Sequence, residues 1–403
     1  MVMNMTYFFN LDLIPFEKVK SNEKTIELRL NDEKRQKLQI GDKIVFVNRE
    51  DENDIIPVKV TALYKFPSFK ELYSSLPLDK CGYTADNMDS ASPDDMLKYY
   101  TKKEEKKFGV LGVEFEVMEK NESYSAGLVL EGGGTRLIYS SGVLDAFIEN
   151  GIEFPYVIGV SGGSCNGASF LGKNIHRMRD ITLKYSNDKR YMSVGSMLRN
   201  GEYLNSKWIF GELTYDISPL DYDTFENSNS VFCIVATNAK TGKAEYFYPT
   251  DFRKDCKEIQ ASCALPVAAK PVTIGKDIYY DGGLLDSIPL EHAFADGCKK
   301  CVVILTQDKD YVKKPMGHSK VVNRFLKKYP LTAKAILNRH NMYNRQREYA
   351  FEQERLGNAL VICPERPLNC STLEKSTQKL QEIYDLGYNQ GLKCIDQVKE
   401  FIK

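Results

Sequence analysis

Two short patterns that combine glycine with a serine or an aspartate could do chemistry in this sequence. The first lies in residues 155–167, PYVIGVSGGSCNG, where Gly159, Ser161 and Gly163 form a Gly-x-Ser-x-Gly pattern. An apolar, β-branched run precedes it and small residues follow, which predicts a strand, a sharp turn and a helix. Such a turn lifts the serine above the end of a sheet as a nucleophile. The helix that begins at Gly162 would direct unpaired N–H groups and a partial positive charge toward the serine hydroxyl.

The second pattern is Asp281-Gly282-Gly283, at the end of a strand-like run, and it offers the base that a serine nucleophile needs. One arrangement would use a histidine instead, and the candidates are His292, His318 and His340. None of the three lies in a recognisable pattern. The other arrangement passes the proton of Ser161 directly to the carboxylate of Asp281.

A glycine-rich turn lies upstream of both patterns. Residues 126–130 predict a short buried strand, Gly132-Gly133-Gly134 follow, and a helical pattern then runs to Glu149. Strand, turn, helix and strand make a βαβ unit, which predicts a parallel or mixed sheet covered by helices. The exposed glycine N–H groups could cradle the phosphates of a dinucleotide, but that motif needs glycine or alanine where Leu137 stands. The alternative is an oxyanion hole, in which these donors stabilise the negative charge on an attacked carbonyl.

Bulk composition places the chain among ordinary globular proteins. It has 403 residues and a net charge of zero, so no overall field draws it to nucleic acid or membranes. The N-terminus does not resemble a signal peptide, and no apolar run approaches the ~18 residues of a spanning helix. Ten scattered cysteines suit reduced thiols, which predicts a cytoplasmic location. The single Cys-x-x-Cys has no partner pair, and we expect no metal ion and no cofactor.

Residues 1–118 predict a separate domain of short strands, joined to the rest by a polar linker over residues 119–125. The run from Lys24 to Leu30 alternates strictly, with Thr25, Glu27 and Arg29 on its polar face. Opposite charges on one face are typical of a solvated strand, and they could equally line a polar pocket.

This first region resembles the ASCH family. The resemblance rests on K-T-I-E-x-R at residues 24–29, the following Ile40-Gly-Asp turn, and the run 108–114, FGVLGVE. It implies a small β-barrel related to the PUA fold, with an RNA or modified nucleoside as its ligand. The family's lysine, threonine and glutamate would correspond to Lys24, Thr25 and Glu27, with Arg29 beside them in the pocket. Some members are amidohydrolases, but binding is the expected role here.

The remainder resembles the patatin-like phospholipases. GGGTR at residues 132–136, the Gly-x-Ser-x-Gly pattern and Asp-Gly-Gly follow one another in that family's order and spacing. The resemblance implies an α/β fold: a three-layer α/β/α sheet domain over residues 126–306, with residues 307–403 as a C-terminal helical extension packed on it.

The same resemblance implies a serine acyl hydrolase whose Ser-Asp dyad is Ser161 and Asp281, acting on a lipid or other acyl ester. Its oxyanion hole would comprise Gly132, Gly133 and Gly134 with Arg136 adjacent, together with the N–H of Gly162. The family usually has glycine after this basic residue, so we expect Leu137 to narrow or reshape the hole. Alternatives are a small-acyl esterase or thioesterase, and an RNA- or nucleoside-binding protein with a weak or regulatory hydrolase domain.

Two segments carry further expectations. Residues 177–220 are irregular and rich in aromatic residues and methionine, which fits either a cap for an acyl chain or a plain cover layer. Residues 309–347 contain eleven lysines and arginines but one acid, Asp310. Their plainer interpretation is the solvated face of two helices; the alternative is peripheral contact with anionic lipid at the inner membrane face. The sequence leaves the oligomeric state open.

Overall fold

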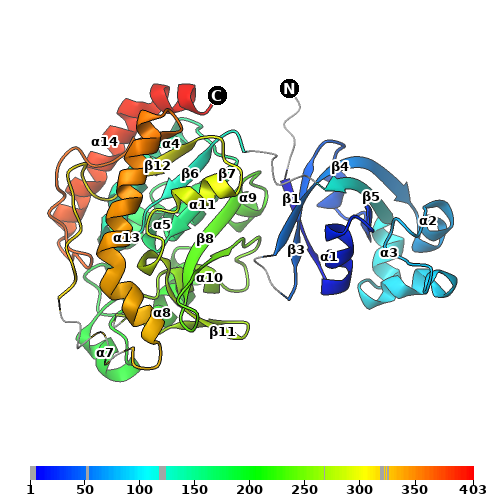
Figure 1. Cartoon of the computed structure of the whole chain (residues 1–403), viewed down its shortest axis with the longest axis horizontal. Coiled ribbons are helices and arrows are strands. Elements are labelled where there is room, and N and C mark those ends of the chain that lie inside the picture. Colours follow the sequence, from blue (N-terminus) through cyan, green and yellow to red (C-terminus); the bar gives the residue numbers. More distant parts are fainter. Residues whose placement is uncertain are drawn as a thin grey trace. The chain divides into compact units, whose positions relative to one another are not determined.

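The computed structural model describes residues 6–50, 54–117, 124–266, 268–317, 322, 324 and 326–403 (Figure 1). The chain divides into two compact units, Met1–Glu122 and Ser123–Lys403. The linker predicted over residues 119–125 lies outside the described residues, apart from residues 124 and 125.

The first unit is a five-stranded sheet with the order β1-β3-β4-β5-β2. The strands are β1 (Thr6–Leu11), β2 (Ile26–Leu30), β3 (Lys43–Asn48), β4 (Ile55–Phe66) and β5 (Val110–Val117), and the helices are α1 (Leu13–Lys20), α2 (Phe69–Ser75) and α3 (Lys102–Phe108). β1 pairs with β3 in parallel and the other pairs are antiparallel. The sheet is an open, curled half-barrel, in keeping with the predicted PUA-like fold (Figure 1).

Strand β2 buries both of its faces. Ile26, Leu28 and Leu30 pack into one apolar cluster, as their alternation predicts. On the other face Glu27 is only 6% exposed, and Lys24 at the entry to the strand is buried as well. Of the two interpretations of this polar face, the solvated one is therefore wrong, and the charges lie in a pocket.

The second unit contains an eight-stranded mixed sheet with the order β10-β11-β8-β7-β6-β12-β13, to which β9 adds by pairing with β8. The strands are β6 (Gly127–Leu130), β7 (Tyr156–Val160), β8 (Val231–Asn238), β9 (Ala244–Phe247), β10 (Val272–Ile274), β11 (Asp277–Asp281), β12 (Cys301–Ile304) and β13 (Ala359–Ile362). The run from β8 to β13 is parallel, whereas β9, β10 and β11 are antiparallel to their neighbours.

Helices cover both faces of this sheet, which confirms the predicted α/β/α layers (Figure 1). The helices are α4 (Leu137–Glu149), α5 (Gly162–Leu171), α6 (Arg177–Tyr185), α7 (Val194–Asn200), α8 (Ser206–Trp208), α9 (Tyr222–Glu226), α10 (Lys257–Ser262), α11 (Leu290–Ala295), α13 (Pro330–Arg355) and α14 (Thr377–Phe401). A π-helical turn, η5, spans Ile209–Ile217. None of the described helices has the length and apolar character needed to cross a membrane.

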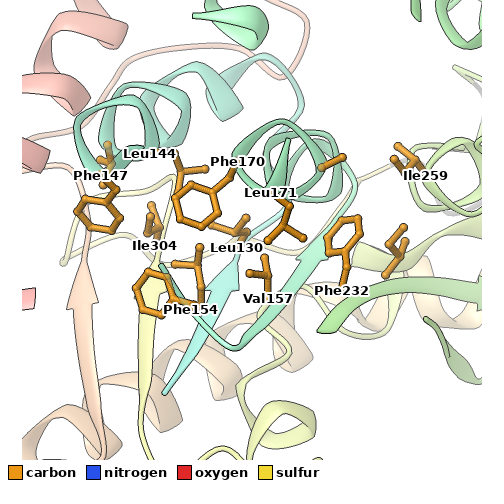
Figure 2. Close-up of a cluster of buried hydrophobic side chains, with 14 of the residues drawn as sticks. Leu130, Leu144, Phe147, Phe154, Val157, Phe170, Leu171, Phe232, Ile259 and Ile304 are labelled. Carbon is orange, nitrogen blue, oxygen red and sulfur yellow. The ribbon is translucent and has the colours of Figure 1, made fainter. Parts of the chain in front are cut away.

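The main core lies between the sheet and α4, α5 and α14. Figure 2 shows Phe147 of α4 and Phe170 of α5 beside Leu130, Val157 and Ile304 of three adjacent parallel strands. Such a layer hides apolar surface on helices and strands together, which is the main stabilising contribution to the fold.

Residues 307–403 are part of this architecture. Their strand β13 extends the sheet beside β12, and α14 packs closely along α4. The two helices approach so closely that a side chain at Gly387 of α14 would collide with the carbonyl oxygen of Tyr139 on α4, so this position requires glycine. The C-terminal region thus completes both the sheet and one helical layer.

Candidate active site

Ser161 lies at the turn between β7 and α5, where the sequence predicted a strand, a turn and a helix. Its φ of 53° and ψ of −124° are strained for a residue with a side chain. The turn also needs its glycines. A Cβ at Gly159 would lie 2.6 Å from the Gly163 carbonyl oxygen, and one at Gly163 would collide with the carbonyl oxygen of Leu130.

The hydroxyl of Ser161 donates a hydrogen bond of 2.8 Å to Oδ2 of Asp281. Asp281 ends β11, which pairs with β8, the neighbour of β7 in the sheet, so the order of strands brings together residues 120 positions apart. The other carboxylate oxygen, Oδ1, accepts 2.8 Å from the N–H of Gly283. The serine and the aspartate named from sequence therefore meet in space.

Burial raises the pKa of Asp281, because its side chain is almost wholly removed from water. The positive charge of Arg339 and the hydrogen bonds from Ser161 and Gly283 act in the opposite direction without cancelling the effect. A carboxylate with a raised pKa is a stronger base toward a serine hydroxyl.

The histidine arrangement finds no support in the described part of the chain, where no histidine lines the cavity above Ser161. His292 stacks on Tyr246, with ring centroids 3.4 Å apart, and its Nε2 lies 3.0 Å from the hydroxyl of Tyr248. His340 lines a neighbouring groove, and His318 lies outside the described residues.

The glycine loop stands directly beside the serine. A Cβ at Gly132 would lie 3.1 Å from Cβ of Ser161, so only glycine brings the backbone this close. Within the described residues, the N–H groups of Gly132 and Gly133 meet no hydrogen-bond acceptor. They are therefore available to a ligand above Ser161.

The C-terminal region anchors this loop. The N–H of Thr135 donates to the carbonyl oxygen of Thr372 at 2.9 Å, and a side chain at Gly134, whose φ is 56°, would collide with the same oxygen. Arg136 donates to the carbonyl oxygen of Cys370 at 3.3 Å and to the hydroxyl of Thr372 at 3.4 Å. The Arg136 guanidinium thus holds the chain at residues 370–372 and also lines the cavity.

Leu137, the departure from the family pattern, packs against the first residue of α5. A Cβ at Gly162 would lie 2.8 Å from Cδ2 and 2.9 Å from Cβ of Leu137. The Leu137 side chain is buried and lines the cavity, while its carbonyl oxygen accepts from Asn166 at 2.9 Å. Leucine thus takes the space that a side chain at Gly162 would need, next to that residue's N–H.

A cavity of about 350 Å³ opens above Ser161 and Asp281. Its apolar wall is formed mainly by α6 and η5, the part of the chain for which a cap was one interpretation. This wall includes Met178, Ile181, Ile209, Phe210, Leu213 and Phe252. Apolar walls over a polar floor suit a ligand with a hydrocarbon chain and one reactive polar group.

Sequence reasoning missed two contributors to this site. Ser262 accepts a hydrogen bond of 2.8 Å from the N–H of Ser161 and donates to the Val235 carbonyl oxygen at 2.6 Å, which fixes the strained turn. Arg339 of α13 donates through Nε to the carbonyl oxygen of Gly283 at 2.5 Å, beside Asp281. A lone arginine in a basic helix has no motif, so its position could be found only in the folded chain.

One group of potential metal ligands, Cys233, His292 and Asp296, occurs among the described residues, away from the cavity. The Asp296 carboxylate already accepts hydrogen bonds from Tyr156 at 2.6 Å and from Tyr248 at 2.7 Å. These contacts make the Asp296 carboxylate part of a hydrogen-bond network with two tyrosines.

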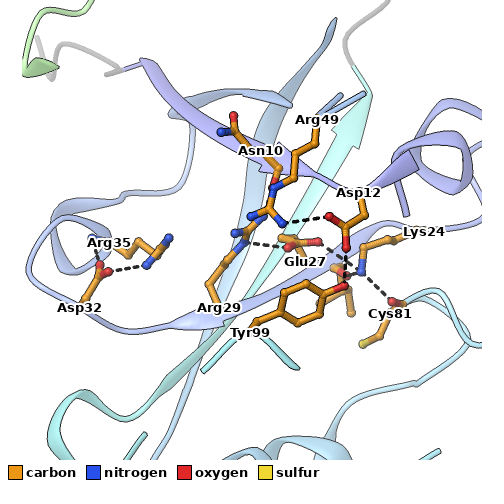
Figure 3. Close-up of polar contacts among 11 residues, drawn as sticks. Asn10, Asp12, Lys24, Glu27, Arg29, Asp32, Arg35, Arg49, Cys81 and Tyr99 are labelled. Carbon is orange, nitrogen blue, oxygen red and sulfur yellow. Dashed lines mark hydrogen bonds and ion pairs between the residues drawn. The ribbon is translucent and has the colours of Figure 1, made fainter. Parts of the chain in front are cut away.

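The first unit has a pocket of its own, of about 340 Å³. Figure 3 shows Glu27 between two cations: the Arg29 Nε lies 2.7 Å and the Lys24 Nζ 3.3 Å from its carboxylate oxygens. Lys24 also donates to the carbonyl oxygen of Cys81 at 2.6 Å. Burial alone would raise the pKa of Glu27, but the two cations outweigh it and hold that pKa below its usual value. Thr25 is not among the residues that line this pocket.

Comparison with known proteins agrees with this division of the chain. Residues 128–294 match the patatin-like phospholipase family, residues 14–119 the ASCH domain, and residues 329–403 a domain of unknown function, DUF6363. The chain therefore contains a region that matches the ASCH domain, followed by one that matches the patatin-like phospholipase domain.

Similar individual proteins include the uncharacterised protein YjjU of Escherichia coli, 28% identical over 64% of this chain and 74% of YjjU. Lysophospholipase NTE1 of Eremothecium gossypii is 25% identical over 82% of this chain but only 22% of NTE1, so the chain spans about a fifth of that relative. Among solved structures, VipD from Legionella pneumophila is 14% identical with a TM-score of 0.36, over 70% of this chain and 68% of VipD.

Proposed function

We propose that the second unit is a serine hydrolase of lipid acyl esters, with Ser161 as nucleophile and Asp281 as base. The observation that carries the proposal is the 2.8 Å hydrogen bond from the Ser161 hydroxyl to Asp281, at the floor of an apolar cavity. The patatin-like family match and the lysophospholipase relatives support the same reaction class.

The proposed reaction uses this geometry. As Oγ of Ser161 attacks the ester carbonyl, Asp281 accepts the hydroxyl proton, and the N–H groups of Gly132, Gly133 and Gly162 stabilise the negative carbonyl oxygen. The tetrahedral intermediate then expels the alcohol, which takes the proton from Asp281. Water next attacks the acyl-serine while Asp281 accepts one of its protons, and collapse releases the fatty acid and returns the proton to Ser161.

The strain at Ser161 fits this role. A residue held at positive φ projects its side chain away from the strand and into the cavity, and the Ser262 hydroxyl holds the Ser161 N–H in that position. Because this N–H is already bonded, the oxyanion donors are those of the neighbouring glycines.

The test is hydrolysis of p-nitrophenyl esters from acetate to palmitate by the wild type, Ser161→Ala and Asp281→Asn. We expect no turnover above background for Ser161→Ala and a loss of about 10²–10⁴-fold for Asp281→Asn, with both proteins folded. Activity that survives Ser161→Ala would refute the mechanism.

The chain-length profile separates a lipid hydrolase from a small-acyl esterase or thioesterase. Each methylene buried in the cavity contributes up to about 0.8 kcal/mol, which is about a fourfold gain in kcat/KM. We expect kcat/KM to rise from acetate to medium chains, whereas a maximum at acetate would favour the small-acyl alternative.

We propose nucleoside binding as the function of the first unit, because its pocket combines the buried Lys24 and Glu27 and the half-buried Arg29 with the rings of Tyr99 and Tyr100. Buried charged donors and acceptors beside aromatic rings suit a flat, polar base. The ASCH match supports a ligand of this kind.

Equilibrium dialysis of the full chain against the four ribonucleosides and a short single-stranded RNA tests this second proposal. Arg49 lines the pocket and is half exposed, so Arg49→Gln should weaken binding without unfolding the domain. Lys65→Gln is the matched control, because Lys65 is exposed on β4 and does not line the pocket. Equal affinities in the two variants would refute a ligand in this pocket.

A further inference from the structure

A second groove adjoins the cavity above Ser161. It has a volume of about 380 Å³ and shares Lys313, Met316 and Arg339 with that cavity. The other polar side chains that line it are Tyr311, Lys314 and His340, and no carboxylate is among its described lining residues. The acyl-ester cavity therefore leads directly into a groove of positive charge.

The two shared cations interact with carboxylates only at longer range: the charge of Arg339 acts on Asp281, and that of Glu131 acts on Lys313. Among the described residues, neither Lys313 nor Arg339 forms an ion pair with a carboxylate. The Lys313 ammonium instead lies 4.3 Å from the ring centroid of Tyr343. Partly buried cations without a carboxylate in direct contact carry a desolvation cost, and an anion bound directly to them would reduce that cost.

Burial and the neighbouring positive charges act together on the ammonium group of Lys313. Burial, together with the charges of Arg339, Arg136 and Arg347, lowers the pKa of Lys313 to about 8. Glu131 acts in the opposite direction but is already bonded to the hydroxyl of Tyr343 at 2.6 Å. The local field at the mouth of the cavity therefore favours an anion.

The position of the groove defines which part of a substrate it meets. When an ester carbonyl lies at Ser161 and its acyl chain fills the apolar cavity, the alcohol portion must leave by another route. Arg339 contacts the carbonyl oxygen of Gly283 beside Asp281, so the groove begins next to the reacting atoms. An anionic group a few bonds from the ester would lie against these cations.

We propose that the groove at Lys313 and Arg339 binds the phosphate group of an anionic lipid whose acyl chain occupies the neighbouring cavity. The inference rests on the proposed acyl hydrolase function and adds its substrate class. A phosphate monoester carries a charge of about −2 at neutral pH and accepts several charge-assisted hydrogen bonds. Lysine and arginine together supply those donors.

The experiment compares two substrates that differ only in the phosphate, 1-decanoylglycerol 3-phosphate and 1-decanoylglycerol. The measured quantity is the ratio of their kcat/KM values, the phosphate preference. Lys313→Met, which removes the charge and keeps the length of the side chain, should lower the preference about tenfold through KM of the phosphate substrate. Lys313→Arg should retain it.

Lys334→Met is the matched control, because Lys334 is exposed on the same helix as Arg339 and lines neither cavity nor groove. It should leave the preference unchanged. If Lys334→Met lowers the preference as much as Lys313→Met, the general charge of residues 309–347 is responsible and the groove is not. An unchanged preference in folded Lys313→Met also overturns the proposal.

Two further measurements keep the proposal testable if Lys313→Met does not fold. In the wild type, the phosphate preference should fall as pH rises through about 8, because Lys313 then loses its proton. Inorganic phosphate should compete with the anionic lipid; if it binds while the lipid phosphate gives no preference, the groove serves free phosphate and the lipid assignment is wrong. Absence of hydrolysis of both esters would instead show that the acyl hydrolase proposal itself has failed.

Discussion

Because Leu137 packs against Gly162, a larger residue at position 162 should affect both the stability of the fold and the rate of ester hydrolysis. In Gly162→Ala the new methyl group would lie 2.8–2.9 Å from two carbons of Leu137, which is too close for either to stay in place. Overpacking of this kind costs about 1–3 kcal/mol. The same shift moves the Gly162 N–H away from the developing oxyanion, and we expect the rate of ester hydrolysis to fall about 10–100-fold.

Removing the leucine should restore part of the loss, because the two side chains compete for one space. Leu137→Gly alone costs several kcal/mol, about 3–5, since it empties a buried site. In the double variant Leu137→Gly/Gly162→Ala the alanine methyl fills part of that space. We therefore expect the double variant to be more stable than the sum of the single effects by at least about 1 kcal/mol, and its hydrolysis rate to exceed that of Gly162→Ala.

Urea unfolding measures the stability, and p-nitrophenyl ester hydrolysis the rate, of the wild type, the two single variants and the double variant. Gly163→Ala is the control, because its methyl group would meet the backbone oxygens of Leu130 and Glu131, which Leu137→Gly does not move. In the double-mutant cycle of Leu137→Gly with Gly163→Ala, the two changes in free energy of unfolding should add within about 0.5 kcal/mol. Additivity in the Gly162 cycle as well would refute the shared-space account of Leu137.

Three more predictions follow from buried charges. Glu27→Gln leaves two cations without their counter-charge and should destabilise the first unit by about 3 kcal/mol, measured by calorimetry, whereas exposed Glu116→Gln should change it by less than about 0.5 kcal/mol. Burial raises the pKa of Asp281 and Arg339 opposes this, so the acid-side fall in kcat/KM should lie at a higher pH than the ordinary pKa of an aspartate. Arg339→Gln should move that fall to still higher pH, and an unchanged profile would contradict the role given to Arg339. Burial raises the pKa of Asp286 to about 6, so folding favours its protonated form, and the stability that this form contributes is lost as pH rises through 6. When pH falls from 7 to 5, the wild type should gain about 1.3 kcal/mol in free energy of unfolding relative to Asp286→Asn. Parallel pH profiles of the two proteins in urea unfolding would contradict this.

The sequence alone determined the parts of this protein that depend on neighbours along the chain. The alternation in residues 24–30, the strand before Ser161 and the glycine turn after Leu130 all appear in the structure close to where local pattern placed them. The requirement for glycine at 159 is also local, because a Cβ there would collide with the backbone of Gly163 in the same turn. The requirement at 163 is tertiary, because a Cβ there would collide with the backbone of Leu130 and Glu131. The local signals are strong because they repeat with the period of the backbone itself.

The tertiary structure alone decided which distant groups meet. Strand order sets Asp281 beside Ser161, a pairing that the sequence could name through family resemblance but could not locate in space. It also decided that the polar face of β2 is buried, since exposure depends on what packs over a strand. The basic run 309–347 was evident in the sequence, but only the packing of the C-terminal region against the cavity selects Lys313 and Arg339 from it as cavity-lining residues. A periodic sequence pattern reflects the geometry of one helix or strand, whereas a site forms only when separate segments of the chain fold against one another.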